Sequence, residues 1–286
     1  MSDEVKKQHY VWEHYLKGWA TKDQIWSKRG SSIFLTSTEN VAQQRYFYEI
    51  QSLNNAEITL LHRIISKGQI STQTVNLSSI DAYITLANSN SHHRRFGMEW
   101  FHSQIERKVA PLLEALRNGD ASVLEDKQRK IDLCIYMGHQ YTRTKKALSS
   151  FTPLPETVVI PDHYKDINQE KIHRAMAFIF AGSIGNSLYD LLDLQLVINE
   201  TEINLITCDQ PIFNLLAIPG EISKESSIYM PISPAYALWA KKGPAERIDT
   251  IDQARALNRF MVKNSLEIIF ASSEAELQEL QELQEL

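Results

Sequence analysis

The sequence predicts an α+β protein in which an early hairpin and several late strands form a largely antiparallel sheet beside a helical middle layer. Apolar residues recur at helical spacing through roughly residues 53–192, whereas short β-type runs dominate residues 193–273. Strands and helices do not alternate as a doubly wound parallel sheet would require. We therefore expect a single α+β domain over residues 1–273, followed by a polar, low-complexity helical tail over residues 274–286.

The N-terminal part is predicted to form a short helix, a hairpin and a further extended run. Apolar, mostly aromatic residues between Val11 and Trp19 share one helical face. Two β-type runs then flank Arg29 and Gly30, which favours a tight turn between antiparallel strands. Tyr46–Ile50 is the next β-type run.

The middle layer is predicted from apolar residues spaced three and four apart. Asn118 and Gly119 end one helix with a common C-terminal signal, and Gly182 and Gly185 allow close packing in another. Prolines at positions 153, 155 and 161 mark a loop, the best candidate for a boundary inside the chain. Helices are expected over residues 56–67, 77–86, 105–116, 120–150 and 170–192, with a polar break over 69–76.

The late part is predicted to be strand-rich. Residues 194–198 and 203–208 read as a hairpin, and 228–239 as a bent strand with Ser233 between two prolines. A helix over 253–264 and a strand over 266–270 follow. In the tail, leucines recur every third residue and drift around a helix by about 60° per step, so we expect a frayed polar helix and no coiled coil.

Composition limits the classes of partner. No apolar run approaches a membrane span, and the N-terminus lacks the apolar core of a signal peptide, so we expect a cytoplasmic protein without membrane contact. Cys134 and Cys208 are predicted to be free thiols. The net charge is −5, and the tail alone carries five glutamates and no base. Because the remaining body is neutral, nucleic acid could bind only through a local basic patch.

Four polar residues from distant segments form the predicted catalytic site. His9 is a candidate general acid or base, and Asp209 at a strand end would orient it or bind a metal. Arg143 would clamp an anion, and Gln140, on the same helical face, would position the substrate. His9 could equally be a cap or a polar contact, and Asp209 a turn cap. No metal-ligand spacing is present, and the sequence identifies no cofactor.

Further residues are predicted to bind substrate. The pair at positions 94 and 95 lies in the densest basic cluster, which is either a solvated face or a phosphate contact. The helix dipole accounts for a lysine near the C-terminal end of the helix over 120–150 without any ligand. The predicted substrate-binding set is Tyr10, Tyr15, Arg94, Arg95, Lys145 and Ser233.

These motifs resemble the mostly bacterial domain-of-unknown-function family DUF4238. Its opening motif His-Tyr-Val-Pro-x-x-Tyr-Leu is similar to His9–Leu16, and its Thr-Ser-Asp-x-Pro motif to Thr207–Pro211. Its Pro-Leu/Ile-Ser-Pro strand is similar to Pro231–Pro234. Trp12 replaces the usual proline and Cys208 the usual serine, which bears on activity if that serine is essential. Other matching segments are Asn40–Ala42, Phe47–Tyr48, Gln140–Thr144 and Leu257–Asn258. The resemblance implies no activity, because the family has none assigned.

Three functional hypotheses follow. The leading one is a hydrolytic effector that acts on a phosphodiester or another phosphate-containing substrate, such as a nuclease or toxin in bacterial defence or stress. The set lacks a nucleophilic serine or cysteine motif, which favours phosphoryl over acyl chemistry. The alternative is a non-catalytic binding module for an anionic ligand or a protein partner. In the third, the motif residues form a buried structural network.

Overall fold

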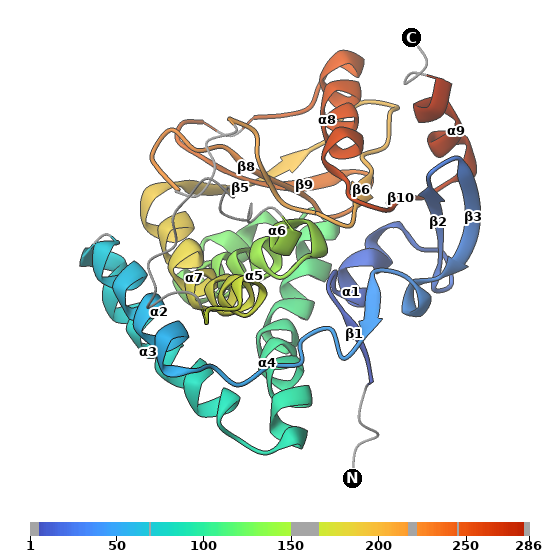
Figure 1. The fold of residues 1–286 in the computed structure, drawn as a ribbon. Helices are drawn as coiled ribbons and strands as arrows, with labels where there is room; N and C mark the ends of the chain where they lie inside the picture. The colour runs from blue at the N-terminus through green and yellow to red at the C-terminus, as the bar shows by residue number, and fades with distance from the viewer. Residues whose placement is uncertain (1–5, 69, 150–165, 217–221, 245, 283–286) are drawn as a thin grey trace, which may run out of the picture.

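Helices fill the middle of the chain and strands gather toward its two ends in the computed structural model (Figure 1). The structure describes residues 6–68, 70–149, 166–216, 222–244 and 246–282. Within these ranges, the strands form two four-stranded antiparallel sheets and a two-stranded ribbon. The predicted α+β class is confirmed, although the strands that were expected in one sheet are divided between two.

The early hairpin joins late strands in the first sheet, as predicted. Its order is β3-β2-β10-β6, so the last described strand lies between the hairpin and a segment some 60 residues earlier. The second sheet has the order β5-β9-β8-β7, and the ribbon pairs β1 with β4. The strands are β1 (Lys7–His9), β2 (Gln24–Arg29), β3 (Ser32–Ser37), β4 (Gln43–Arg45), β5 (Asp193–Ile198), β6 (Thr207–Cys208), β7 (Phe213–Asn214), β8 (Ile228–Pro231), β9 (Tyr236–Lys241) and β10 (Ile269–Ala271).

Side-chain caps set where most of the longer helices begin. Asn54 and Thr250 form capping boxes with Glu57 and Gln253. Each cap side chain accepts a hydrogen bond from the Glu57 or Gln253 backbone amide, and each cap backbone amide donates to the Glu57 or Gln253 side chain. The helices are α1 (Glu13–Leu16), α2 (Asn55–Lys67), α3 (Ile70–Ala87), α4 (Ser91–Arg117), α5 (Lys127–Thr142), α6 (Lys145–Ser149), α7 (Gln169–Leu191), α8 (Ile251–Asn264) and α9 (Glu274–Glu282), with 3-10 turns η1 (Lys17–Trp19), η2 (Thr38–Asn40) and η3 (Ala121–Leu124).

Helices α5 and α7 form the centre of the helical layer, and glycine permits their contact. A Cβ atom at Gly185 would lie 2.8 Å from the Cys134 carbonyl oxygen, which confirms the predicted close packing there. Gly182 is different, because the nearest atom to its Cβ position is a Val75 methyl carbon at 3.4 Å, an ordinary contact. Both helices contribute residues to the inner cavity described below, and α7 also lines the outer groove.

Two predictions about where the helical layer is interrupted are wrong. The polar stretch after α2 was expected to interrupt helical structure, but α3 already begins at Ile70 and buries Asn76. The expected continuous helix over 120–150 is instead divided into η3, α5 and α6. Asp126 caps α5, and the Thr144 hydroxyl accepts a hydrogen bond from the Ala147 amide at the start of α6. The predicted proline loop lies outside the described residues.

Three predictions about the late and early strands are also wrong. β5 pairs with β9 and β6 with β10, so 194–198 and 203–208 are not a hairpin. The expected bent strand is the β8–β9 hairpin, and the Ser233 hydroxyl accepts the turn's Tyr236 amide at 3.1 Å. Residues 46–50 continue as a turn and loop after β4 and form no strand. In each case the error lies in which segments pair, a long-range property.

The tail is a packed helix. Leu277 and Leu280 are buried, and α9 lies against the early hairpin, where Figure 1 shows it beside β2 and β3. The expectation of a frayed helix is therefore wrong for Glu274–Glu282. The leucine spacing drifts too fast for a coiled coil, but two of these side chains are enough to hold one short helix against a sheet.

Candidate functional site

The predicted residue Gln140 joins the opening motif to α5. Its Nε2 donates to the Tyr10 carbonyl oxygen at 2.9 Å, and its Oε1 accepts the Trp12 amide at 3.4 Å and Arg143 Nη2 at 2.7 Å. Gln140 is fully buried. Its amide is thus occupied by protein groups, which explains why a glutamine lies beside an apolar helix face.

Arg143 is buried in an ion pair. Its Nη2 donates to Glu106 Oε1 at 2.6 Å, and only 5% of the side chain is exposed. Burial raises the pKa of Glu106, while the charge and hydrogen bond of Arg143 oppose that rise. The pair therefore holds α5 against α4 and also places a positive charge inside the helical layer.

The Asp209 carboxylate is bound by the backbone. Oδ1 accepts the Leu266 amide at 2.8 Å, and Oδ2 accepts the Glu267 amide at 2.6 Å and the Ile268 amide at 3.3 Å. These bonds fix the segment between α8 and β10 to the end of β6. The geometry fits the turn-cap alternative considered from the sequence.

His9 lies near this network but is bonded differently. It is half-buried, its Nε2 has no hydrogen-bond partner among the described residues, and its carbonyl oxygen accepts the Tyr48 hydroxyl at 2.8 Å. Burial lowers the pKa of His9, and the nearby Glu13 partly offsets this effect. The structure thus joins Gln140 and Arg143 directly, while Asp209 binds backbone amides of a different segment, the one between α8 and β10.

The predicted substrate-binding residues are mostly engaged within the fold. The Tyr15 hydroxyl donates to the Pro231 carbonyl at 2.7 Å, and Lys145 forms an ion pair with Glu267 at 2.9 Å while lying 5.1 Å from the centre of the Tyr10 ring. Ser233 stabilises a hairpin turn. The two arginines are different: Arg95 reaches the surface at the start of α4, and Arg94 lines the larger of the two hollows described next.

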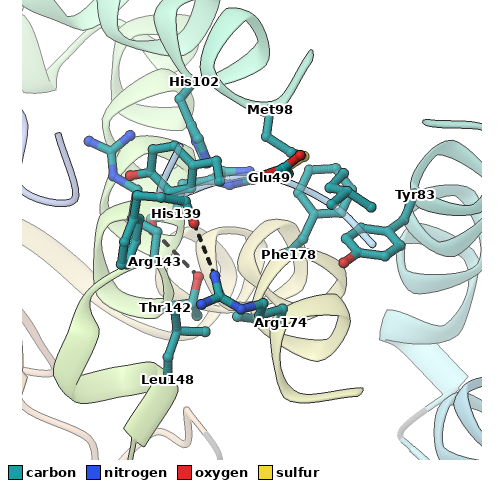
Figure 2. Close-up of a pocket in the computed structure, with 14 residues that line it drawn as sticks. Glu49, Tyr83, Met98, His102, His139, Thr142, Arg143, Leu148, Arg174 and Phe178 are labelled. Carbon is teal, nitrogen blue, oxygen red and sulfur yellow. Dashed lines mark hydrogen bonds between the residues drawn. The ribbon is translucent and has the colours of Figure 1, made fainter. Parts of the chain in front are cut away.

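An inner cavity of about 50 Å³ lies between α4, α5, α7 and the segment after β4 (Figure 2). His102 from α4 and His139 from α5 face each other there, with ring centres 5.5 Å apart. Both are at least 95% buried, and within the described parts of the chain the Nδ1 atom of each lacks a hydrogen-bond partner. The lining residues are Phe47, Tyr48, Glu49, Ile50, Tyr83, Met98, His102, His139, Thr142, Arg143, Leu148, Arg174, Ala177 and Phe178.

Burial and charge determine the protonation of this cluster. Burial, together with the Arg143 charge, lowers the pKa of His139 to about 3 and places the pKa of His102 well below its ordinary value. Both rings are therefore neutral at physiological pH. Burial raises the pKa of Glu99 to about 7, with Glu106 adding to the rise and Arg143 opposing it. A carboxyl group that titrates near neutrality thus lies at the edge of the cluster.

Sequence reasoning missed most of this cluster. Glu99, His102 and Glu106 are spaced three and four apart on α4, and His139 and Arg143 are four apart on α5. Such spacing places the α4 residues on one face of their helix and the α5 residues on one face of theirs. Acidic and histidine side chains on one face of an otherwise amphipathic helix indicate a possible polar site. The sequence did not show that the two faces meet.

We expect stability to depend on pH through Glu99. A raised pKa means that the folded state holds the proton while the unfolded state has lost it, so stability falls as pH rises from about 4.5 to about 7. Glu99→Gln removes this fall and should exceed wild type by up to about 3 kcal/mol at pH 8, with little difference at pH 4. Urea unfolding of both proteins across this range measures the difference. Parallel curves would contradict the assignment.

An outer groove of about 440 Å³ adjoins the inner cavity. Three cations line it: Arg94 from α4, and Lys171 and Arg174 from α7. Phe47, Glu49, Ile50 and Arg174 line both hollows, so the groove and the cavity share a wall. The remaining lining residues are Gln44, Tyr46, Gln51, Ser52 and Glu170.

Backbone carbonyls orient the three cations. Arg174 Nη1 donates to the Phe47 carbonyl oxygen at 3.0 Å, drawn as a dashed line in Figure 2, while its Nε faces Glu170 at 3.0 Å. Lys171 Nζ donates to the Ser52 carbonyl at 2.9 Å, and Arg94 donates to the Ser89 carbonyl at 2.9 Å. Each head group has more donors than these bonds use, so each can still bind a ligand oxygen.

The sequence matches the family described as "Protein of unknown function (DUF4238)" over residues 7–275. The chain belongs to the DUF4238 family. The predicted resemblance is thereby confirmed, and the match spans the ribbon, both sheets and every helix that lines the two hollows. No curated protein and no solved structure matches this DUF4238 chain.

Two further features of the DUF4238 chain concern membranes and metals. No helix among the described residues is long and apolar enough to cross a bilayer. The same residues contain no group of three or more histidine, cysteine, aspartate or glutamate side chains arranged to hold a metal ion.

Proposed function

We propose that this chain binds a phosphate-containing anionic ligand in the outer groove. The observation that carries the proposal is the convergence of Arg94, Lys171 and Arg174 on one polar hollow of about 440 Å³. That volume is within the range of small-molecule sites. Guanidinium groups suit phosphate because their donors match two oxygens at once, and lysine adds a point charge.

The balance of charge in the groove supports an anion. Three cations and two acids, Glu49 and Glu170, line it. Glu49 is paired with Arg95 at 2.9 Å outside the lining set, and Glu170 with Arg174. An incoming phosphate would compete with the exposed Glu170 for Arg174, and such exposed pairs contribute little to stability. Lys171 Nζ also lies 3.9 Å from the buried Glu57 carboxylate, which an incoming phosphate would not need to displace from its other bonds.

Substitution of the groove cations should weaken phosphate binding. We expect Arg174→Gln and Lys171→Gln each to lower affinity for pyrophosphate and ATP about tenfold, because each removes a charge-assisted hydrogen bond. Isothermal titration calorimetry at low salt measures both ligands. Arg259→Gln, which removes an exposed cation on α8, is the matched control and should bind as wild type. Absence of pyrophosphate and ATP binding by wild type would refute the proposal.

Hydrolysis of the bound ligand is the second candidate function. The observation in its favour is the pair of neutral histidines that line the cavity beside the groove, each with a buried Nδ1 atom that has no hydrogen-bond partner among the described residues. In this proposal, water attacks phosphorus and the bond to the leaving oxygen breaks. A histidine takes the water's proton and passes it to the leaving oxygen, and Arg143 stabilises the developing charge. Of the predicted catalytic set, Arg143 lines this cavity.

Hydrolysis predicts a separation of binding from turnover. We expect wild type to cleave bis(p-nitrophenyl) phosphate and RNA, and His102→Gln and His139→Gln to lose at least about 100-fold in rate, as removal of a general base does, while still binding pyrophosphate. Growth of bacteria that express the protein, with RNA and DNA integrity measured in the same cultures, tests the nuclease, toxin and defence hypotheses. Binding without cleavage by wild type would favour the non-catalytic binding module.

A further inference from the structure

A basic and aromatic surface continues from the outer groove. We define it as the ribbon platform: Lys7, Arg45, Tyr46, His92, Arg95 and Phe96. The guanidinium carbons of Arg45 and Arg95 lie 5.1 and 5.2 Å from the centre of the Tyr46 ring. Phe96 meets Tyr46 edge-on at 5.9 Å, and His92 packs on Phe96 at 5.2 Å. Planar cationic and aromatic groups thus lie side by side.

Buried polar contacts hold the platform in place. The fully buried Gln8 donates to the Arg95 carbonyl at 2.7 Å and accepts the Tyr48 amide at 2.8 Å, which ties the ribbon to α4. The Tyr46 amide donates to the Lys6 carbonyl at 2.9 Å. Tyr46 has a φ of +51°, a value that side chains other than glycine seldom adopt. The ring position is therefore set by the surrounding structure before any ligand binds.

The platform carries charge that the fold does not require. Lys7 is directly opposite Arg45 in the antiparallel ribbon, an arrangement of like charges that disfavours pairing. Among the described residues Arg45 forms no ion pair, and its guanidinium group packs over the Tyr46 ring. The body of the chain outside the five-glutamate tail is neutral, so the positive charge here is local. A local concentration of this kind fits an anionic partner.

The groove and the platform form one surface, joined by Gln44, Tyr46 and Arg94. Gln44 and Tyr46 flank Arg45, Arg94 adjoins Arg95, and all three line the groove. An anion seated between the groove cations therefore lies beside the stacked planar groups.

We propose that the ligand of the groove is single-stranded nucleic acid, with one phosphate on the groove cations and neighbouring bases against the ribbon platform. This inference rests on the proposed phosphate binding. Exposed guanidinium and aromatic planes bind unpaired bases by stacking, which an acidic peptide or a lipid headgroup cannot use. Duplex DNA keeps its bases stacked on one another, so its binding would be favoured only by the attraction between its phosphates and the cations.

The test compares two variants at the platform with two controls. We expect Arg45→Gln and Tyr46→Leu each to weaken binding of a short fluorescent oligothymidylate or oligouridylate about tenfold by loss of stacking, and Arg45→Gln also removes one positive charge. Pyrophosphate binding should stay unchanged in Arg45→Gln, because Arg45 does not line the groove. Arg45→Gln should also reduce the slope of log affinity against log salt by about 0.7. Arg174→Gln should weaken oligonucleotide and pyrophosphate alike, and Arg259→Gln neither.

The outcomes separate this inference from the function on which it rests. If both platform variants bind oligonucleotide as wild type while Arg174→Gln does not, the platform has no role and the groove function stands. If wild type binds duplex DNA, polyglutamate or anionic phospholipid vesicles as tightly as the oligonucleotide, the surface is a general anion site and the inference is wrong. If pyrophosphate does not bind at all, the groove function itself fails. Melting temperatures identify any variant that is misfolded, and Arg45, being exposed, provides a variant that should fold.

Discussion

Arg143→Ala should lower the free energy of unfolding by about 3 to 5 kcal/mol. The substitution leaves Glu106 buried without the cation that faces it at 2.6 Å, and Gln140 loses the bonds at 2.7 and 3.2 Å that hold its Oε1. An uncompensated buried carboxylate must ionise at high cost or take up a proton. Urea unfolding at pH 7 measures the loss. A decrease of less than about 1 kcal/mol, typical of exposed ion pairs, would contradict this account.

Removing both charges provides the control. A double variant, Arg143→Met with Glu106→Leu, should recover most of the stability that either single change costs, because an apolar pair of similar size replaces the ions.

This comparison affects how function is tested. Loss of activity in Arg143→Ala alone would not distinguish a catalytic arginine from an unfolded protein. The histidine variants, which leave the ion pair intact, are the more informative test of hydrolysis.

Local signals in the sequence were sufficient where local chemistry decides the structure. The end of α4 was predicted from Asn118 and Gly119, and Gly119 adopts a φ of +82°. The structure shows that the starts of α2 and α8 also depend on local chemistry, the caps at Asn54 and Thr250. The β2–β3 turn at Gly30 is of the same kind. Strand pairing was less predictable, because β5 pairs with β9, about 40 residues later, and the three short strands β6, β7 and β8 lie between them in the sequence.

The candidate site was predictable only in part for the same reason. Gln140 and Arg143 were identified because polar groups beside an apolar helix face need partners, and their bonds confirm that such partners exist. The roles assigned to His9 and Asp209 remain proposals. The outer groove could not have been predicted, since Arg94 and Arg174 come from helices separated by dozens of residues and meet only through the packing of α3, α5 and α7.

Gly138→Ala should be the most damaging single-methyl change in the helical layer. A Cβ at this position would lie 2.3 Å from the Ala181 carbonyl oxygen and 2.7 Å from the Gly185 amide nitrogen. Both are backbone atoms of α7, so no side chain can move aside and the helices must separate. We expect a loss of about 3 kcal/mol, the upper range for overpacking, despite the better helix propensity of alanine. Thermal and urea unfolding of the variant measure it.

Gly182→Ala is the matched control on the facing helix. Its added methyl would meet only a Val75 methyl carbon at 3.4 Å, so the helix propensity of alanine should prevail and stability should stay equal or rise by up to about 1 kcal/mol.

The two variants should also differ in binding. Separation of α5 from α7 moves His139 away from Phe178 and shifts Arg174 relative to the groove, so Gly138→Ala should lose pyrophosphate affinity at temperatures where it is still folded, whereas Gly182→Ala should keep it. Equal effects of the two substitutions would mean that helix contact does not set the geometry of the hollows.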